Sequence, residues 1–239
     1  MSVHKTFRIR RFDPGQDARP YWATYRLEAK PKFSVLDGLF AILENQDGTL
    51  GFRYSCRAGM CGSCAMRIDG REGLACRVRL EHLGETISIE PLRSLPIIKD
   101  LATDMTPFFE QYRKIDPFFV GDSPSFAQQT LEPLRVDPAS ASRQSANRAI
   151  DCISCGACFS ACPTVASNPA YLGPAALNRA FALAADERDR ESGRAALALG
   201  PEGAYSCRSV GNCVSVCPAG VAPLAAIQLL RRGKTASAP

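Results

Sequence analysis

The chain lacks long apolar runs: no segment approaches the roughly 18 consecutive apolar residues that a membrane-spanning helix needs. Residues 1–12 carry several basic side chains but no apolar stretch of the kind that a secretory signal requires. We therefore expect a protein that is soluble by itself and that keeps its cysteines in a reducing cytosol.

The chain also has only a small excess of charge of one sign. The 29 Lys and Arg residues against 24 Asp and Glu residues leave a net charge of +5 without a polybasic block, which argues against nucleic acid as a main partner. The chain has no P-loop and no G-x-G-x-x-G motif, and its two histidines, His4 and His82, are expected at the surface. No substrate chemistry is therefore predicted on this chain.

Cysteine, by contrast, is plentiful. The chain has 11 cysteines in 239 residues, a share of about 5% that lies below the density of a small disulfide scaffold. The number is odd, so pairing within the chain would leave one cysteine over. We therefore interpret the cysteines as ligands of metal or redox cofactors.

Hydrophobic patterning predicts an α+β unit over residues 1–105. Ser34 is a predicted N-cap for a helix over residues 35–43, which the polar cluster at residues 45–48 stops. Three further segments are typical of strands: residues 5–10, 21–28 and 86–90.

The second unit, over residues 106–239, is predicted to be all-helical, because strand alternation ends after Pro96. Thr106 and Pro107 predict the start of a helix that continues through Ile115. Residues 121–140, rich in Pro, Ser and Asp, are predicted to be irregular. Further helices are predicted at residues 141–150, 174–185 and 221–231.

The first cysteine group has the C-x4-C-x2-C spacing with a more distant fourth cysteine, which is typical of plant-type 2Fe-2S ferredoxins. Gly59 and Gly62 are expected to give the loop the backbone freedom to turn around a cluster. A structural zinc site is the alternative. The predicted ligands are Cys56, Cys61, Cys64 and Cys76.

Two later groups form an internal repeat. Residues 152–163 match the bacterial C-x2-C-x2-C-x3-C-P run, and its cysteines and proline recur 55 residues further on. Only Cys155 has no counterpart, because Val210 stands at the repeated position. The repeated pairs are Cys152 and Cys207, Cys158 and Cys213, Cys162 and Cys217, and Pro163 and Pro218.

In the bacterial run the fourth cysteine binds the other cluster, and applying this rule to both repeats divides the cysteines into two sets. The predicted 4Fe-4S ligands are Cys152, Cys155, Cys158 and Cys217. The predicted ligands of the other cluster are Cys162, Cys207 and Cys213. Because Val210 has no lone pair to offer, that cluster is predicted to be 3Fe-4S; a pair of zinc sites is the alternative. Three clusters in one chain predict a path for electron transfer between a partner that exchanges two electrons and another electron carrier.

This order of motifs resembles the iron–sulfur subunits of succinate dehydrogenase and fumarate reductase over nearly the whole chain. Supporting stretches are residues 52–62, 168–169, 172–176 and 223–228. The resemblance implies an N-terminal β-grasp ferredoxin domain that faces a FAD-carrying flavoprotein subunit. It also implies a helical ferredoxin domain that faces membrane anchor subunits and a quinone. The chain would then be a peripheral electron-transfer subunit at the cytoplasmic face of the cell membrane.

The resemblance also implies a quinone pocket beside the 3Fe-4S cluster, with Pro163, Arg208 and Arg231 as candidate residues. Many succinate dehydrogenases have Trp where this chain has Ser167 and His where it has Arg208, which weakens the case for ubiquinone. The residues around Cys155 and Asn168 are similar to the fumarate reductase branch. For Arg208 and Arg231, a solvated surface charge is the alternative.

Two other functions stay open. One is the iron–sulfur subunit of another flavin-linked oxidoreductase, although such subunits often keep four cysteines in both repeats. The other is a free-standing multi-cluster ferredoxin. The direction of the reaction, succinate oxidation or fumarate reduction, depends on cluster and quinone potentials that spacing does not give.

Overall fold

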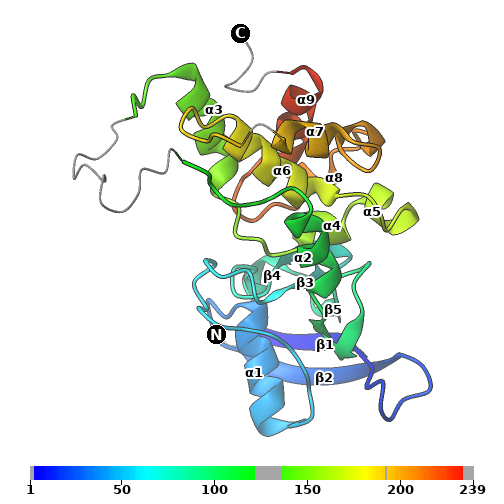
Figure 1. Cartoon of the computed structure of the whole chain (residues 1–239). Helices are drawn as coiled ribbons and strands as arrows, with labels where there is room; N and C mark the ends of the chain where they lie inside the picture. The colour runs from blue at the N-terminus through cyan, green and yellow to red at the C-terminus, as the bar shows by residue number, and fades with distance from the viewer. Residues whose placement is uncertain (1–2, 122–135, 192, 234–239) are drawn as a thin grey trace, which may run out of the picture. The chain divides into compact units, whose positions relative to one another are not determined.

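The computed structural model of the chain describes residues 3–121, 136–191 and 193–233 (Figure 1). The chain divides into two compact units. The first comprises Met1–Phe108, Ile153–Ala161 and Ser215–Pro218. The second comprises Phe109–Cys152, Cys162–Val214 and Ala219–Pro239. Neither unit is one continuous stretch, and the domain boundary between residues 105 and 106 stays a prediction.

The first unit is built on a five-stranded mixed sheet in the order β2-β1-β5-β3-β4. β1 pairs with β2 antiparallel and with β5 parallel, and β3 pairs antiparallel with both β4 and β5. This is the β-grasp architecture, and the three predicted strands are confirmed. The strands are β1 (Val3–Arg11), β2 (Tyr21–Ala29), β3 (Ala65–Ile68), β4 (Arg71–Leu74) and β5 (Thr86–Glu90).

Helix α1 (Val35–Asn45) packs against β2 and covers one face of the sheet (Figure 1). Ser34 is its N-cap: the Ser34 hydroxyl accepts a hydrogen bond from the Asp37 N–H, and the Asp37 carboxylate accepts one from the Ser34 N–H. A Cβ atom on Gly38 would lie 2.5 Å from the Phe7 ring, so the helix approaches β1 closely. The predicted N-cap and helix are therefore confirmed.

The β3–β4 hairpin was missed by the sequence analysis. Its turn contains Asp69 and Gly70, with φ of 48° and 80°, and Asp-Gly is a strong signal for this kind of two-residue turn. All four residues of β3 are buried, including the charged Arg67, and in β4 one of the two buried residues is the charged Glu72, so neither strand shows apolar residues on one face and polar residues on the other. The end of strand structure predicted at Pro96 is also wrong, because β6 (Ile97–Lys99) and β7 (Ala102–Thr103) form a small ribbon beyond it.

Helices and loops make up the second unit, whose described residues contain no strand. α6 (Gly173–Ala184) is buried along most of its length and packs against α3, α7 and α9. The helices predicted at residues 141–150, 174–185 and 221–231 are confirmed. The other helices of this unit are α3 (Ala141–Ile150), α5 (Pro163–Ser167), α7 (Arg194–Leu199), η3 (Ala204–Ser206) and α9 (Pro223–Arg231).

Three short elements lie at or near the places where the chain passes between the units: α2 (Thr106–Arg113), α4 (Ala157–Ser160) and α8 (Asn212–Ser215). α2 ends at Arg113, so Ile115, predicted within this helix, lies beyond it and is nevertheless buried. Of the segment predicted to be irregular, residues 122–135 lie outside the described residues. None of the described helices is both long enough and apolar enough to cross a membrane.

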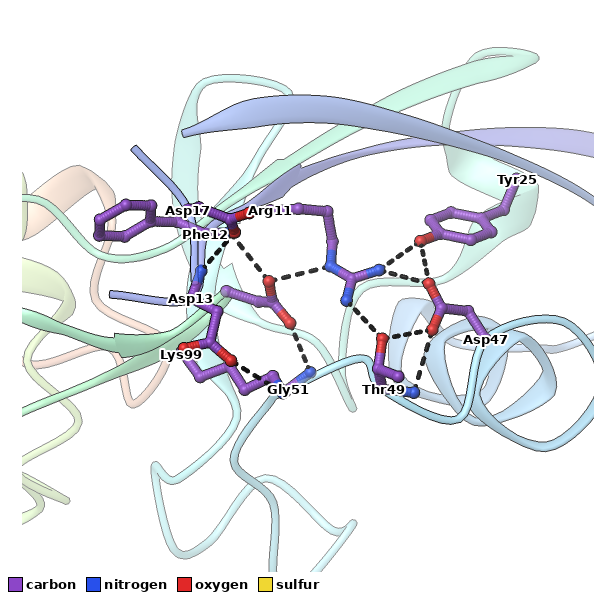
Figure 2. Close-up of polar contacts among 10 residues, drawn as sticks. Arg11, Phe12, Asp13, Asp17, Tyr25, Asp47, Thr49, Gly51 and Lys99 are labelled. Carbon is purple, nitrogen blue, oxygen red and sulfur yellow. Dashed lines mark hydrogen bonds and ion pairs between the residues drawn. The ribbon is translucent and has the colours of Figure 1, made fainter. Parts of the chain in front are cut away.

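A buried charge network fixes the end of β1 (Figure 2). Arg11, 5% exposed, forms ion pairs with Asp47 and Asp100 at 2.5 and 2.9 Å. Asp47 also accepts hydrogen bonds from the Thr49 and Tyr25 hydroxyls, and those contacts hold the pKa of its carboxyl well below the usual range. The network joins β1, β2, the end of α1 and the residues after β6, which stabilises the first unit.

Candidate metal centres

The first cysteine group lies on a loop that leads into β3 and on the turn that follows β4. Cys64 directly precedes β3, and the Ala75 N–H donates to the Cys64 carbonyl at 3.0 Å, which joins the two segments. Gly59 and Gly62 have φ of +78° and +73°, so the backbone turns that we expected at these glycines are confirmed. All 11 cysteines lie among the described residues, and none of them is in a disulfide there.

Backbone N–H groups converge on one sulfur of this loop. The Cys56 Sγ atom accepts hydrogen bonds from the N–H groups of Ala58, Met60 and Cys61, at 3.3–3.4 Å. Hydrogen bonding from the Ser63 side chain, followed by that from backbone N–H groups, lowers the pKa of Cys61 to about 6. These donors stabilise negative charge on sulfur, so the loop fits a cluster held by thiolates.

Cys64 has a different environment from that of Cys61. It is buried, and burial raises the pKa of its thiol to about 12. A buried thiol gains little from ionising alone, but a bound metal ion deprotonates its cysteine ligands outright. The loop therefore presents sulfur atoms that are exposed at Cys56 and shielded from water at Cys64.

The internal repeat of the sequence is also a repeat of backbone conformation. Ser154 and Ser209 have φ of 52° and 57°, and Gly156 and Gly211 have φ of 81° and 90°. The short helices α4 and α8 follow these bends at the same offset of 55 residues. Cys155 and Val210 each stand between the two bends, so they occupy equivalent positions in the repeat.

The first compact unit contains three of the four cysteines predicted for the 4Fe-4S cluster, namely Cys155, Cys158 and Cys217. Cys152 directly precedes the segment 153–161 of this unit. That segment is anchored at Ser160, whose hydroxyl donates to the buried carboxylate of Glu72 at 2.9 Å. The same hydroxyl accepts from the Arg93 N–H at 2.7 Å, so the turn that carries Cys158 is tied to β4 and to the residues after β5.

In the second unit, the three cysteines predicted for the 3Fe-4S cluster line one cavity: Cys162, Cys207 and Cys213. Val210 lines the same cavity and is 59% exposed. The Ser209 N–H donates to the Cys207 Sγ atom at 3.4 Å, and burial raises the pKa of Cys213 to about 11. The cavity thus offers three thiol groups. The apolar side chain of Val210 occupies the position at which the first repeat has Cys155.

The three candidate quinone residues divide into two kinds. Pro163 and Arg208 line the cavity of the three cysteines. The Arg231 guanidinium instead donates to the carbonyls of Ala204 and Cys207, and its Nη1 atom lies 3.3 Å from the Ser209 hydroxyl. Arg231 therefore holds the loop that carries Cys207.

Sequence reasoning assigned no role to Tyr171, which lines the same cavity and is fully buried. Its hydroxyl has no hydrogen-bond partner among the described residues. The stretch around it supported the family resemblance, but no spacing rule singles out a tyrosine at this position. The sequence also does not predict the hydrogen bond from Ser160 to Glu72, because it joins residues that are 88 positions apart.

The sulfur groups are arranged differently from a site for one metal ion. Within the described ranges, no three His, Cys, Asp or Glu side chains are placed to hold a single ion. An iron–sulfur cluster does not require such a group, because its cysteines bind different iron atoms of the cluster and need not surround one ion. The donor set, made of thiols with N–H donors around them, fits the clusters predicted from the spacing.

Comparisons with known proteins agree with this description. Residues 6–110 match a family model described as a 2Fe-2S iron-sulfur cluster binding domain. Residues 148–221 match one described as a 4Fe-4S dicluster domain. The chain therefore contains both kinds of domain, in the predicted order.

Curated relatives match most of the chain, and two of them illustrate the similarity. The fumarate reductase iron-sulfur subunit of Haemophilus influenzae is 35% identical over 96% of this chain and 91% of its own length. The succinate dehydrogenase iron-sulfur subunit of Paracoccus denitrificans is 35% identical over 95% and 86%. Among solved structures, a chain of the Mycobacterium smegmatis Sdh1 complex matches with a TM-score of 0.83 and 25% identity, over 98% of this chain and 96% of that one.

Proposed function

Since the chain belongs to the family of iron–sulfur subunits of succinate dehydrogenase and fumarate reductase, we propose that it carries three clusters that conduct electrons between a flavin and a quinone. The 2Fe-2S cluster is assigned to Cys56, Cys61, Cys64 and Cys76. The 4Fe-4S cluster is assigned to Cys152, Cys155, Cys158 and Cys217. The 3Fe-4S cluster is assigned to Cys162, Cys207 and Cys213.

The observation that carries the third assignment is the cavity of three cysteines with Val210 at the position equivalent to Cys155. A cubane cluster takes one thiolate per iron, and this cavity supplies three. Val210 contributes no lone pair, so a fourth iron would have no protein ligand. A trinuclear cluster matches the donors that are present.

The residues of the chain hold and tune the clusters rather than transform a substrate. When bound, an iron–sulfur cluster exchanges one electron at a time without making or breaking substrate bonds. The N–H groups of Ala58, Met60 and Cys61 favour the more negative state at Cys56, and Ser160 and Glu72 fix the turn that carries Cys158. Cys64 is buried and keeps part of the first site away from water.

The partners follow from the family. We assign a FAD-containing flavoprotein subunit at the 2Fe-2S end, and membrane anchor subunits with a quinone at the 3Fe-4S end. The chain would then lie on the cytoplasmic face of the cell membrane as a peripheral subunit. Pro163 and Arg208 line the trinuclear cavity and are the candidates to face the quinone, with Arg231 behind them on the loop of Cys207.

The two alternatives are less favoured. A free-standing ferredoxin would not need a close match, over 86–91% of their length, to subunits of succinate and fumarate enzymes. The iron–sulfur subunit of another flavin-linked oxidoreductase is disfavoured by the same match and by Val210.

Purification of the native complex tests the proposal. We expect a large FAD-containing subunit to copurify with the chain, and succinate oxidation or fumarate reduction coupled to a quinone. EPR spectroscopy of the oxidised complex should show one paramagnetic centre, the 3Fe-4S cluster, and reduction should reveal the other two. Isolation of the chain alone with all its clusters and no flavoprotein would support the ferredoxin alternative.

A further inference from the structure

Tyr171 lies in the turn before α6, and its side chain lines the cavity that also contains Cys162, Cys207 and Cys213. Its N–H donates to the Asn168 carbonyl at 3.1 Å, and α6 begins two residues later at Gly173, whose φ is +85°. This bend directs the Tyr171 side chain to the cavity that Cys162 and Cys207 also line. The side chain is 0% exposed, so water does not reach it from outside.

The Tyr171 hydroxyl lacks a hydrogen-bond partner among the described residues. A buried hydroxyl without a partner is destabilising, and native proteins rarely keep one unless a bound group satisfies it. A phenol is protonated at neutral pH, so Tyr171 has an O–H group to donate toward the cysteine sulfur atoms that line the same cavity.

We propose that the Tyr171 hydroxyl donates a hydrogen bond to the 3Fe-4S cluster on its Cys207 side, and so raises the reduction potential of this cluster. The inference rests on the proposed function, because it takes the trinuclear cluster as the bound group. Reduction adds negative charge to the cluster, and a donor aimed at sulfur stabilises that charge. Tyr171 is thus a positioning and tuning residue; it does not bind iron.

The Ser209 N–H already donates to Cys207 at 3.4 Å, so Tyr171 would be the second donor on this side of the cluster. The two donors differ in how they can be tested. A backbone N–H cannot be removed without changing the loop, whereas the change of Tyr171 to Phe deletes only one oxygen atom and keeps the ring that fills the space. Tyr205, two residues before Cys207 and 63% exposed, provides a matched phenol outside the cavity.

The experiment is a redox titration of the intact complex, monitored by the EPR signal of the oxidised 3Fe-4S cluster. We expect Tyr171→Phe to make reduction of this cluster about tenfold less favourable, a shift of about 59 mV to lower potential for one electron. The potentials of the 2Fe-2S and 4Fe-4S clusters should not move. Tyr205→Phe should leave all three potentials at the wild-type values.

An unchanged potential of the trinuclear cluster in Tyr171→Phe would overturn the inference while leaving the cluster assignment intact. A wild-type complex without a 3Fe-4S signal would overturn the proposed function instead. If Tyr171→Phe fails to assemble the cluster, incorporation of 3-fluorotyrosine at position 171 gives the deciding measurement. This residue keeps the hydroxyl but is a stronger donor, so the potential should rise; no change would again contradict the inference.

Discussion

The identity that we propose for the third cluster depends on one residue, Val210. It lies at the position equivalent to Cys155, between bends at Ser209 and Gly211 that match those at Ser154 and Gly156. Because the side chain is 59% exposed, a change to Cys does not require the core to repack. Val210→Cys would therefore place a fourth thiol where the first repeat has one.

We expect Val210→Cys to convert the trinuclear centre toward a 4Fe-4S cube. The oxidised 3Fe-4S signal should decrease, and the potential of this centre should fall, because the added thiolate brings negative charge. Val214→Cys is the matched control, since it adds a thiol to the following helix α8, outside the repeated position. An EPR spectrum that is the same in wild type and Val210→Cys would contradict our interpretation of this residue.

We expect substitutions of Arg208 and Arg231 to have different effects. Arg208 lines the cavity, and a cation beside a quinone carbonyl stabilises the negative charge that develops on its oxygen. We expect Arg208→Leu to slow quinone-linked turnover by about tenfold or more, equivalent to about 1.4 kcal/mol. Succinate oxidation with an artificial acceptor at the flavin end, and the 3Fe-4S signal, should be unchanged.

Arg231→Leu should instead weaken or broaden the 3Fe-4S signal, because it removes the donors that hold the carbonyls of Ala204 and Cys207. The exposed neighbour Arg232 serves as the control for both variants, and Arg232→Leu should behave as wild type. Wild-type quinone turnover in Arg208→Leu would mean that this arginine is a surface charge and that the quinone binds elsewhere.

Asp47 links the stability of the first unit to pH. Hydrogen bonds from Thr49 and Tyr25, together with the Arg11 ion pair, hold its pKa below the ordinary value. A carboxylate with a lowered pKa in the folded state stabilises the fold above its unfolded pKa, and this stabilisation is lost as the pH falls below about 4. Asp47→Asn leaves Arg11 short of a charged partner in a buried position.

We therefore expect Asp47→Asn to lower the free energy of unfolding by about 1–3 kcal/mol at pH 7. The difference from wild type should shrink as the pH is lowered through 4 toward acid, which thermal unfolding of the cluster-loaded protein at several pH values would measure. Glu44→Gln, an exposed change in the last turn of α1, should have little effect at any pH. Equal destabilisation by Asp47→Asn at pH 7 and in acid would rule out the electrostatic explanation.

At the scale of the elements, Gly62 lets the loop of the first cysteine group approach the segment that carries Cys155. Its φ is +73°, and a Cβ atom there would lie 2.7 Å from the Cys155 Cβ atom. We expect Gly62→Ala to reduce the EPR signals of both the 2Fe-2S and the 4Fe-4S clusters. Gly70 has a similar φ of +80° in the β3–β4 turn, but its nearest neighbour would be 3.8 Å away.

Gly70→Ala is therefore matched for backbone strain and differs only in steric freedom. It should cost about 1 kcal/mol of stability and keep both signals. If the two alanine variants lose the same amount of cluster, backbone strain rather than the close approach to Cys155 explains the need for glycine at position 62.

Elements with one exposed face were predictable from the sequence. β1, β2 and β5 alternate between apolar and polar residues, and α1 has a single apolar stripe after a strong N-cap. β3 and β4 could not be found in this way, because all residues of β3 are buried and one of the two buried residues of β4 is the charged Glu72. The β6–β7 ribbon is too short to produce a pattern.

The candidate sites were predictable to the extent that spacing determines them. Cysteine spacing depends on local chain geometry, so it indicates which residues share a loop and where the repeat places Val210. The cavity that contains Tyr171 and the tie from Ser160 to Glu72 join residues far apart in the sequence. Such contacts depend on packing, and no local motif reports them.

At the scale of the whole molecule, the compact units group the cysteines differently from the motifs. Cys162 belongs to the second motif in sequence but to the same unit as Cys207 and Cys213. Cys217 ends the third motif but belongs to the same unit as Cys155 and Cys158. The last cysteine of each motif is thus grouped with two cysteines of the other motif, as the rule for paired clusters requires, whereas Cys152 is the last residue of a segment of the second unit.

This exchange predicts which cluster each variant loses. Cys162→Ser should remove the 3Fe-4S signal and retain the 4Fe-4S signal, whereas Cys217→Ser should impair the 4Fe-4S cluster and retain the 3Fe-4S signal. Both should lower the iron content from about nine atoms per chain, the sum expected for the three cluster types. EPR spectra combined with iron and zinc analysis of the purified complex would measure these effects. If each variant damaged the cluster of its own motif instead, the last cysteine of each motif would have to be assigned to that motif's own cluster. The equivalence of Val210 with Cys155 would then no longer indicate which cluster lacks its fourth iron.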